Sequence, residues 1–275
     1  MCGIAGYCLN MKDPAIPDRA RLTAALLAAI EERGQHATGM SWWDTTTIDG
    51  RIRVRKQAVP ATEYIRSGRV AEEITPTVRT ALLHTRWATQ GKPEVNANNH
   101  PIMVPPVVGV HNGHVTNDGA LFKRLGVERT AEVDSEAAFA LLAHDPAPVE
   151  EVLPRIQGRA AIAWMDKRDV KDNRGGPTLH LSRIEGSPLA VGQTKAGSFL
   201  FASTMRLLHQ ACAAAGVDGL EWEQELDEYE YMKVRRGRVL QYMTYGHLVE
   251  RPKPTPKRAS ASRRALQGWQ FGQAS

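Results

Sequence analysis

The pattern of hydrophobic residues in the first part of the chain predicts a strand, then a helix, then several further strands. Residues 2–9 contain no charged side chain, which is typical of a buried strand. Between residues 22 and 30, leucine and isoleucine recur at helical spacing, with Asp18 as a candidate N-cap and Gly34 as the stop. Strand-like runs follow over 39–43, 51–57, 79–83 and 107–110, and a polar, proline-containing loop is expected over 88–106.

The rest of the chain mixes helices and strands without strict alternation. Helical patterns occur over 117–125, 134–143, 148–156 and 204–215. Strand-like runs occur over 159–165, 178–183, 189–192, 199–202, 222–226, 230–234 and 238–242. This mixture predicts a layered α+β domain rather than a series of parallel βαβ units.

Composition limits the class of protein. Of the 275 residues, 42% are hydrophobic and 24% are charged, which is ordinary for a globular domain. The three cysteines are too few and odd in number for a disulfide framework, and we expect Cys8 and Cys212 to be buried as small hydrophobic residues. We expect no signal peptide and no membrane span, because the longest strongly apolar helical stretch, 22–30, is far too short. The sequence therefore predicts a cytoplasmic protein.

Charge is concentrated at the C-terminus. The segment 251–275 carries six basic residues and no acid, so a net charge of +5 leaves only −1 for the other residues. We therefore expect a body over 2–249 and a basic, flexible tail over 250–275. The tail, which also holds Trp269 and Phe271, is interpreted as a solvated end or a segment that docks on a partner. Nucleic-acid binding is not expected of the body and is the least favoured role of the tail.

The candidate nucleophile is Cys2. Once Met1 is removed, Cys2 carries a thiol and a free α-amine on one residue, and the amine can take the thiol proton directly or through a water. The alternative is that a cysteine after the initiator is an ordinary residue. Four further segments bear on the choice: ERGQHATG at 32–39, HTRWATQG at 84–91 with Asn99-His100-Pro101 beyond it, VHNGHVTN at 110–117, and DSE at 134–136.

Some of these residue types suit amide chemistry on physical grounds. Asn112 offers a side-chain amide and Gly113 an unobstructed backbone N–H for an oxyanion, although Asn-Gly is also a common tight turn. Arg86 can hold a carboxylate in a bidentate fork, or it can be a surface arginine. Asp134 can hold an ammonium group, or it can cap the helix that follows it, or do both.

Together with Cys2-Gly3-Ile4, these ordered motifs resemble the class II glutamine amidotransferases, most closely the glutaminase domain of glucosamine-6-phosphate synthases. The resemblance covers roughly residues 2–245. It implies a four-layer α/β/β/α sandwich of the N-terminal-nucleophile hydrolase type. It also implies that Trp87 and Thr89 belong to a loop closing over glutamine, that Arg33 orders the nucleophile, and that His100 lies near the site. Gln90 departs from the synthases, which have histidine there.

The resemblance implies hydrolysis of the L-glutamine side-chain amide through a γ-glutamyl thioester on Cys2, releasing ammonia and glutamate. No cofactor or metal is expected. Because no acceptor domain is found in the sequence, we expect a separate ammonia-accepting synthase subunit as partner. The alternatives are an N-terminal-nucleophile amidase acting on another amide and a glutamine-binding regulatory subunit without turnover.

Overall fold

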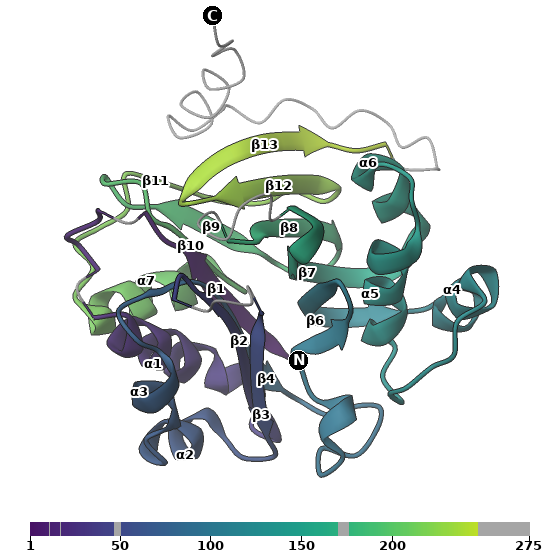
Figure 1. Cartoon of the computed structure of the whole chain (residues 1–275), viewed down its shortest axis with the longest axis horizontal. Coiled ribbons are helices and arrows are strands. Elements are labelled where there is room, and N and C mark those ends of the chain that lie inside the picture. The colour runs from purple at the N-terminus through teal and green to yellow at the C-terminus, as the bar shows by residue number, and fades with distance from the viewer. Residues whose placement is uncertain (11, 17, 47–50, 170–175, 247–275) are drawn as a thin grey trace, which may run out of the picture.

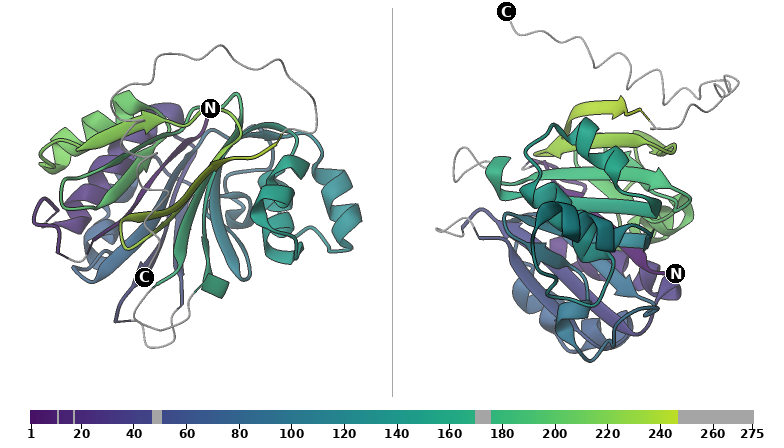
Figure 2. Two further views of the ribbon diagram at one scale, coloured as in Figure 1. Left: turned by 90° about the horizontal axis from the view of Figure 1, so that it is seen from above. Right: turned by 90° about the vertical axis from the view of Figure 1, so that its right-hand side faces the viewer.

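A computed structural model describes residues 1–10, 12–16, 18–46, 51–169 and 176–246. Its strands form two antiparallel sheets, and its helices lie on the outer sides of the two sheets (Figures 1 and 2). The predicted tail over 250–275 lies outside the described residues.

The first sheet has seven strands and carries the N-terminal strand β1 near its centre. In spatial order it consists of β11 (Trp222–Glu225), β9 (Ala190–Gln193), β10 (Phe199–Ala202), β1 (Gly3–Cys8), β4 (Val78–Arg86), β2 (Ala37–Asp44) and β3 (Arg53–Gln57). Gly3 pairs with Thr85 of β4, so the residue before β1 lies at the end of the sheet where β4 finishes.

The second sheet has six strands. In spatial order it consists of β13 (Arg238–Thr244), β12 (Glu230–Arg235), β8 (Thr178–Glu185), β7 (Gly158–Asp166), β6 (Val107–Val115) and β5 (Ile102–Val104). Strands β6 and β7 pair along their whole length, from Val107 opposite Asp166 to Val115 opposite Gly158.

Two groups of helices form the outer layers. Those on the first sheet are α1 (Arg19–Ile30), α2 (Ala61–Arg66), α3 (Arg69–Glu73) and α7 (Met205–Ala215), whereas those on the second are α4 (Asp118–Leu125), α5 (Ser135–His144) and α6 (Val149–Val152). Within the described ranges there are also four short 3-10 segments: η1 (Glu31–Arg33), η2 (Asn96–Asn98), η3 (Leu153–Arg155) and η4 (Lys167–Asp169).

Three hydrophobic cores separate four layers. One lies between the helices α1 and α7 and the first sheet, one between the two sheets, and one between the second sheet and α5. Strand β1 shows why this arrangement follows from the sequence. Because side chains alternate across a strand, Ala5 and Tyr7 pack toward α1, whereas Ile4 and Cys8 face the other sheet. The predicted α/β/β/α sandwich is confirmed.

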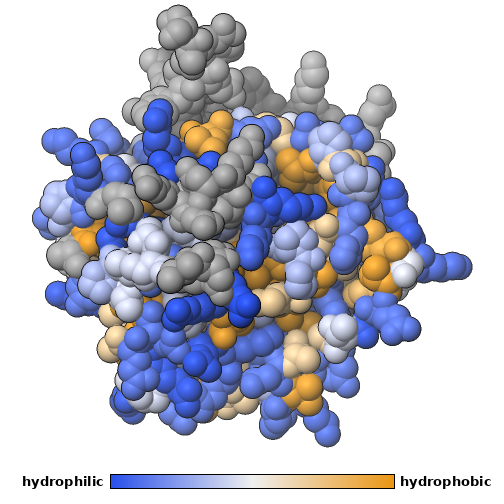
Figure 3. Space-filling model, viewed as in Figure 1, coloured by the Kyte–Doolittle hydropathy of each residue, from blue (hydrophilic) through white to orange (hydrophobic). Residues whose placement is uncertain are grey.

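Several local predictions are also confirmed. The Asp18 side chain accepts a hydrogen bond from the Arg21 backbone N–H at 2.9 Å, as expected of the N-cap of α1, and Gly34 ends the following turn. Cys8 and Cys212 are both buried. Among the described residues, no helix is long and apolar enough to cross a membrane. The face shown in Figure 3 is mainly hydrophilic, with small scattered apolar patches.

The loop prediction over 88–106 is partly wrong, because this stretch contains η2 and the strand β5. Strand β5 has three residues and exists through its pairing with β6, in which Ile102 faces Gly109. The helices α2 and α3 were not predicted, since five or six residues are too few to show a helical period. The expected helix over 148–156 is divided into α6 and η3.

Candidate active site

The start of β1 and the C-terminal part of β6 meet at a cavity of about 300 Å³. It is lined by Met1, Cys2, Trp87, Thr89, Asn112, Gly113, His114, Arg159 and Ser187. Five of these residues were predicted from the sequence as site residues: Cys2, Trp87, Thr89, Asn112 and Gly113. The structure therefore brings together residues from three motifs that are far apart in the chain.

Close packing fixes the backbone of Cys2. A Cβ atom on Gly3 would lie 2.6 Å from both the Ile30 carbonyl oxygen and Thr85 Oγ1, so only glycine fits after Cys2. The Ile4 N–H then donates to Ser203 Oγ at 2.9 Å. The Cys2 thiol points toward the Trp87 carbonyl oxygen, with Sγ 3.7 Å away. Burial raises the pKa of the Cys2 thiol, and the contact with Trp87 lowers it by less. A base is therefore needed to form the thiolate.

Two side chains converge on the carbonyl oxygen of Cys2. Arg33 Nε donates to it at 2.9 Å. In the amide orientation that satisfies both neighbours, Asn112 Nδ2 donates to the same oxygen at 3.0 Å, and Asn112 Oδ1 accepts from Arg33 Nη2 at 3.2 Å. Arg33 thus lies beside Cys2, where the resemblance placed it. Asn112 uses one N–H to hold Cys2, and its role toward an oxyanion stays a prediction.

Gly113 is a strand residue and not part of a turn. It lies within β6 opposite Ala160 of β7, so the alternative of a tight Asn-Gly turn is wrong. Its φ of +147° is open to glycine, and a Cβ atom there would lie 1.8 Å from the Arg159 carbonyl oxygen. The approach of β7 therefore excludes every larger residue at this position.

Arg86 is buried, with 3% of its surface exposed, so the alternative of a surface arginine is wrong. Its Nη1 donates to Asn99 Oδ1 at 2.8 Å, and its Nη2 donates to the Gly91 carbonyl at 2.8 Å and to the Gln90 carbonyl. Burial lowers the pKa of Arg86, and its interaction with Cys2 partly offsets this. The guanidinium therefore lies within electrostatic range of the nucleophile and also orders the following loop.

Trp87 and Thr89 lie on that loop at the rim of the cavity. Trp87 is 48% exposed and stacks on the ring of His36, with ring centres 4.7 Å apart. His36 Nδ1 accepts from the Ala88 backbone N–H at 2.9 Å, which anchors the start of the loop. The position of an exposed tryptophan over the cavity is consistent with a loop that closes on a ligand.

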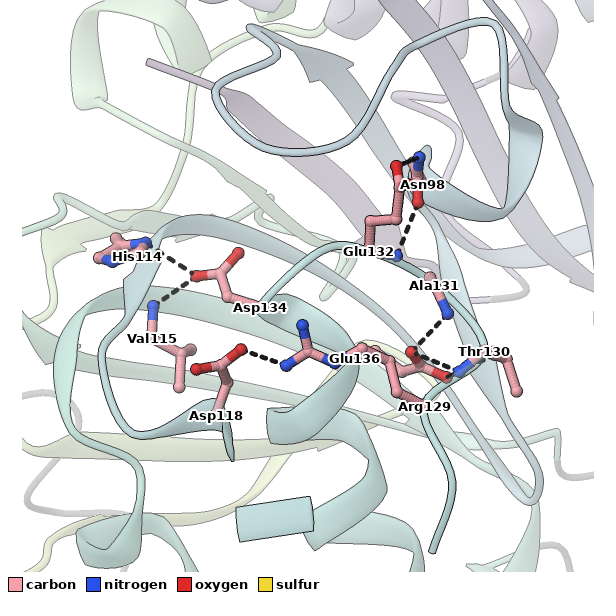
Figure 4. Close-up of polar contacts among 10 residues, drawn as sticks. All are labelled: Asn98, His114, Val115, Asp118, Arg129, Thr130, Ala131, Glu132, Asp134 and Glu136. Carbon is pink, nitrogen blue, oxygen red and sulfur yellow. Dashed lines mark hydrogen bonds and ion pairs between the residues drawn. The ribbon is translucent and has the colours of Figure 1, made fainter. Parts of the chain in front are cut away.

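Asp134 faces β6 instead of capping α5 (Figure 4). Its Oδ2 accepts from the Val115 backbone N–H at 2.5 Å and lies 3.3 Å from His114 Nδ1. Asp134 does occupy the N-cap position of α5, but its side chain makes no capping hydrogen bond, because the carboxylate accepts from the Val115 N–H. The charge of Asp134 acts on Cys2 and raises the pKa of its thiol, so the carboxylate also lies within electrostatic range of the nucleophile.

His100 lies in a buried group of three histidines. Its ring stacks on His84, with centres 4.2 Å apart, and lies 6.4 Å from the ring of His111. Burial lowers the pKa of all three, for His84 to about 3. Among the described residues, neither ring nitrogen of His100 has a hydrogen-bond partner, and no three potential ligands are grouped to hold a metal. These contacts support a packing role for His100.

Three residues that line the cavity were not predicted, namely His114, Arg159 and Ser187. His114 directly follows the His-Asn-Gly motif and could have been inferred from its position. Arg159 lies opposite His114 across β6 and β7, and only the strand register reveals this.

Comparison with known proteins identifies relatives by sequence. A family model described as a glutamine amidotransferase domain matches residues 84–210. The isomerizing glutamine–fructose-6-phosphate aminotransferase of Brucella suis biovar 1 (strain 1330) is 30% identical over 262 residues, covering 92% of this chain and 38% of that protein. The protein of the same name from Chlamydia trachomatis serovar D is 31% identical over 203 residues, covering 70% and 30%. The chain thus spans less than two fifths of these curated relatives.

Solved structures share the fold. The glutamine phosphoribosylpyrophosphate amidotransferase from B. subtilis matches with a TM-score of 0.67 and 17% identity, over 89% of this chain and 49% of that chain. A glutamine aminotransferase class-II domain protein from Silicibacter pomeroyi matches with a TM-score of 0.53 and 17% identity, over 89% of this chain and 100% of that chain. The family match and the sequence similarity agree, and the chain carries a glutamine amidotransferase domain in a fold that it shares with these solved structures.

Proposed function

We propose that this protein hydrolyses the side-chain amide of L-glutamine through a γ-glutamyl thioester on Cys2. The observation that carries the proposal is that Cys2, Asn112 and Gly113 line one cavity together with the loop residue Thr89. A thiol nucleophile, donors for an oxyanion and a closing loop are the parts that acyl transfer from an amide requires.

Formation of the nucleophile requires removal of Met1. In the full chain Met1 lines the cavity, with its Sδ 3.9 Å from Arg33 Nη2 and 3.8 Å from Arg159 Nη2. Its removal frees the α-amine of Cys2 and opens this part of the cavity. The amine is then the base that a buried thiol needs, acting directly or through a water.

The chemistry proceeds in two halves. The sulfur attacks the carboxamide carbon as its proton passes to the α-amine, and negative charge develops on the carboxamide oxygen beside Asn112 and Gly113. The C–N bond breaks, the nitrogen takes the proton, and ammonia leaves a thioester on Sγ. Water then attacks the thioester carbon and gives a proton to the amine. The C–S bond breaks, the sulfur regains a proton, and glutamate is released.

Specificity for a free amino acid is assigned to Arg86 and Asp134. Arg86 would hold the α-carboxylate and Asp134 the α-ammonium group. The two side chains carry opposite charges, and both lie close enough to Cys2 to shift the pKa of its thiol. The Asp134 oxygen Oδ1 has no hydrogen bond among the described residues, which leaves it available to an ammonium group.

A glutaminase assay with a nucleophile variant tests the proposal. Wild-type protein should release ammonia from L-glutamine, and Cys2→Ala should release none while keeping its fold by circular dichroism. The glutamine-like electrophile 6-diazo-5-oxo-norleucine should label Cys2 and spare the buried Cys8 and Cys212. Binding of glutamine without turnover would favour the regulatory alternative, and turnover of other amides alone would favour an amidase of different specificity.

We further propose that the ammonia is used by an acceptor on a separate subunit, in the cytoplasm. The match to the S. pomeroyi chain supports this proposal. It extends over the whole of that chain, so the fold occurs there as a chain of its own. The six basic residues of 251–275 would attract an acidic partner surface, with Trp269 and Phe271 as apolar anchors. Deletion of 251–275 should spare the glutaminase and weaken salt-sensitive capture of the partner. Unchanged capture would exclude the docking role.

A further inference from the structure

The loop 87–99, which follows Arg86, and the segment 126–134, which ends at Asp134, are joined by two hydrogen bonds between one pair of residues. Asn98 Nδ2 donates to Glu132 Oε2 at 2.8 Å, and the Glu132 backbone N–H donates to Asn98 Oδ1 at 2.8 Å (Figure 4). We call this reciprocal pair the Asn98–Glu132 clamp. Among the described residues, no other hydrogen bond joins the loop 87–99 to the segment 126–134.

On the loop side, the clamp is linked to Arg86 through the residues that accept its hydrogen bonds. Asn98 is fully buried and also donates to the Lys92 carbonyl at 3.2 Å. The next residue, Asn99, accepts from Arg86 Nη1. Gly91, whose carbonyl accepts from Arg86, lies so close that a Cβ atom on it would be 2.7 Å from Asn98 Nδ2. Movement of Asn98 therefore displaces the acceptors that fix the Arg86 guanidinium.

On the other side, the clamp leads directly to Asp134, two residues after Glu132. This segment is otherwise fixed by Glu136, whose carboxylate accepts from the backbone N–H groups of Thr130 and Ala131 (Figure 4). Asp134 itself is fixed to β6 through the Val115 N–H. The segment thus forms a rigid support, and the clamp attaches the loop to it.

The rest of the loop is separated from this support. An open groove of about 730 Å³ lies between residues 88–93 and the side chains of Arg129 and Glu132. Among the described residues, only the hydrogen bonds of the clamp join the loop to the segment 126–134, so we expect the distance between the loop and Asp134 to depend on them.

We propose that Asn98 and Glu132 are positioning residues that set the separation of Arg86 and Asp134 and so select a free α-amino acid. This inference rests on the proposed function, because it assigns the α-carboxylate to Arg86 and the α-ammonium group to Asp134. The clamp acts on binding and selectivity, not on the thioester chemistry at Cys2.

Exchange of donor and acceptor gives a sharp test. Asn98→Asp places a carboxylate against the Glu132 carboxylate, and KM for L-glutamine should rise roughly 10- to 100-fold with kcat changed less than about threefold. Asn98→Asp combined with Glu132→Gln restores a donor–acceptor pair in the reverse sense and should recover most of the loss. Glu132→Gln alone keeps an acceptor for Asn98 Nδ2, so it should raise KM only slightly. Glu128→Ala, which removes an exposed acid in the same segment, is the matched control.

Selectivity gives a second readout that a general loss of stability would not produce. The ratio of kcat/KM for L-glutamine to that for glutaramate, which lacks the α-amine, should fall in Asn98→Asp and recover in the double variant. If the double variant is folded but retains the KM of Asn98→Asp, the clamp has no positioning role. A wild-type protein that fails to hydrolyse glutamine would instead overturn the proposed function. The clamp would then be measured by glutamine binding to Cys2→Ala.

Discussion

Asn112 is expected to have two separable roles, and substitution can divide them. Its side chain is 1% exposed, donates to the Cys2 carbonyl at 3.0 Å and accepts from Arg33 at 3.2 Å. Asn112→Ala removes both hydrogen bonds. The Cys2 carbonyl still accepts from Arg33 Nε, and the half-buried guanidinium of Arg33 can reach water, so neither partner is left without a hydrogen bond. The expected loss of stability is therefore about 1–3 kcal/mol for two ordinary hydrogen bonds.

The kinetic effect should be larger than the effect on stability. If the second N–H of Asn112 serves the oxyanion, its loss should lower kcat by roughly 100- to 1000-fold, about 2.7–4 kcal/mol of transition-state stabilisation. KM should change little, because Arg86 and Asp134 are assigned to the α-groups of glutamine. The assays are steady-state release of ammonia from L-glutamine and urea unfolding of the same preparations.

Asn112→Asp separates the two roles further. The aspartate keeps the shape of the side chain and can pair with Arg33, but one of its oxygens then faces the Cys2 carbonyl oxygen without a donor, so its stability should be similar to that of Asn112→Ala. A carboxylate beside the thiol disfavours the thiolate and offers no donor to the oxyanion, so kcat should fall at least as far as in the alanine variant. If Asn112→Asp keeps nearly full kcat, or if Asn112→Ala raises KM while sparing kcat, the oxyanion assignment is wrong.

Three other predictions address Met1, substrate charge and pH. Active enzyme should lack Met1 by intact-mass measurement, and full activity with Met1 retained would contradict an amine base on Cys2. Arg86→Ala and Asp134→Ala should each lower kcat/KM for glutamine roughly 30- to 1000-fold, mainly through KM, because a substrate charge loses its partner; unchanged KM would contradict this. Burial holds the pKa of His100 well below its usual value, so the unfolded chain binds more protons below about pH 6.5 and stability falls with falling pH. His100→Phe should reduce this slope by up to about 1.4 kcal/mol per pH unit in urea titrations, and an unchanged slope would refute it.

Much of the fold follows from periodicity in the sequence. The strand β1 was predictable from an uninterrupted run without charge, and the helix α1 from leucine and isoleucine at helical spacing, with Asp18 marking its start. The elements that could not be predicted are held by partners elsewhere in the chain. Strand β5 is stabilised by its pairing with β6, and local sequence does not record that pairing.

The site also has features that the local sequence predicts and features that depend on partners elsewhere in the chain. Motifs identified five of the residues that line the cavity, because their order along the chain resembles that of a known family. They did not reveal that Arg86 would be buried among loop carbonyls or that Asp134 would turn toward β6. Those outcomes depend on which backbone groups lie near each side chain once the sheets are assembled. Arg159 enters the cavity for the same reason, through its register opposite His114.

The proposed nucleophile and the proposed oxyanion donor come from different sheets, so we expect catalysis to depend on the core between the sheets. Cys2 precedes β1 of the first sheet, and Asn112 lies on β6 of the second. Between them Ile4 and Val110 are fully buried in one core, and the contact of Asn112 with the Cys2 carbonyl joins the sheets directly. Because protein interiors are close-packed, this core resists small changes in the separation of the sheets. The reacting groups are therefore fixed, whereas adjustment to the substrate is left to the loop after Arg86. Substitutions between the sheets should consequently affect kcat, and substitutions in the loop should affect KM.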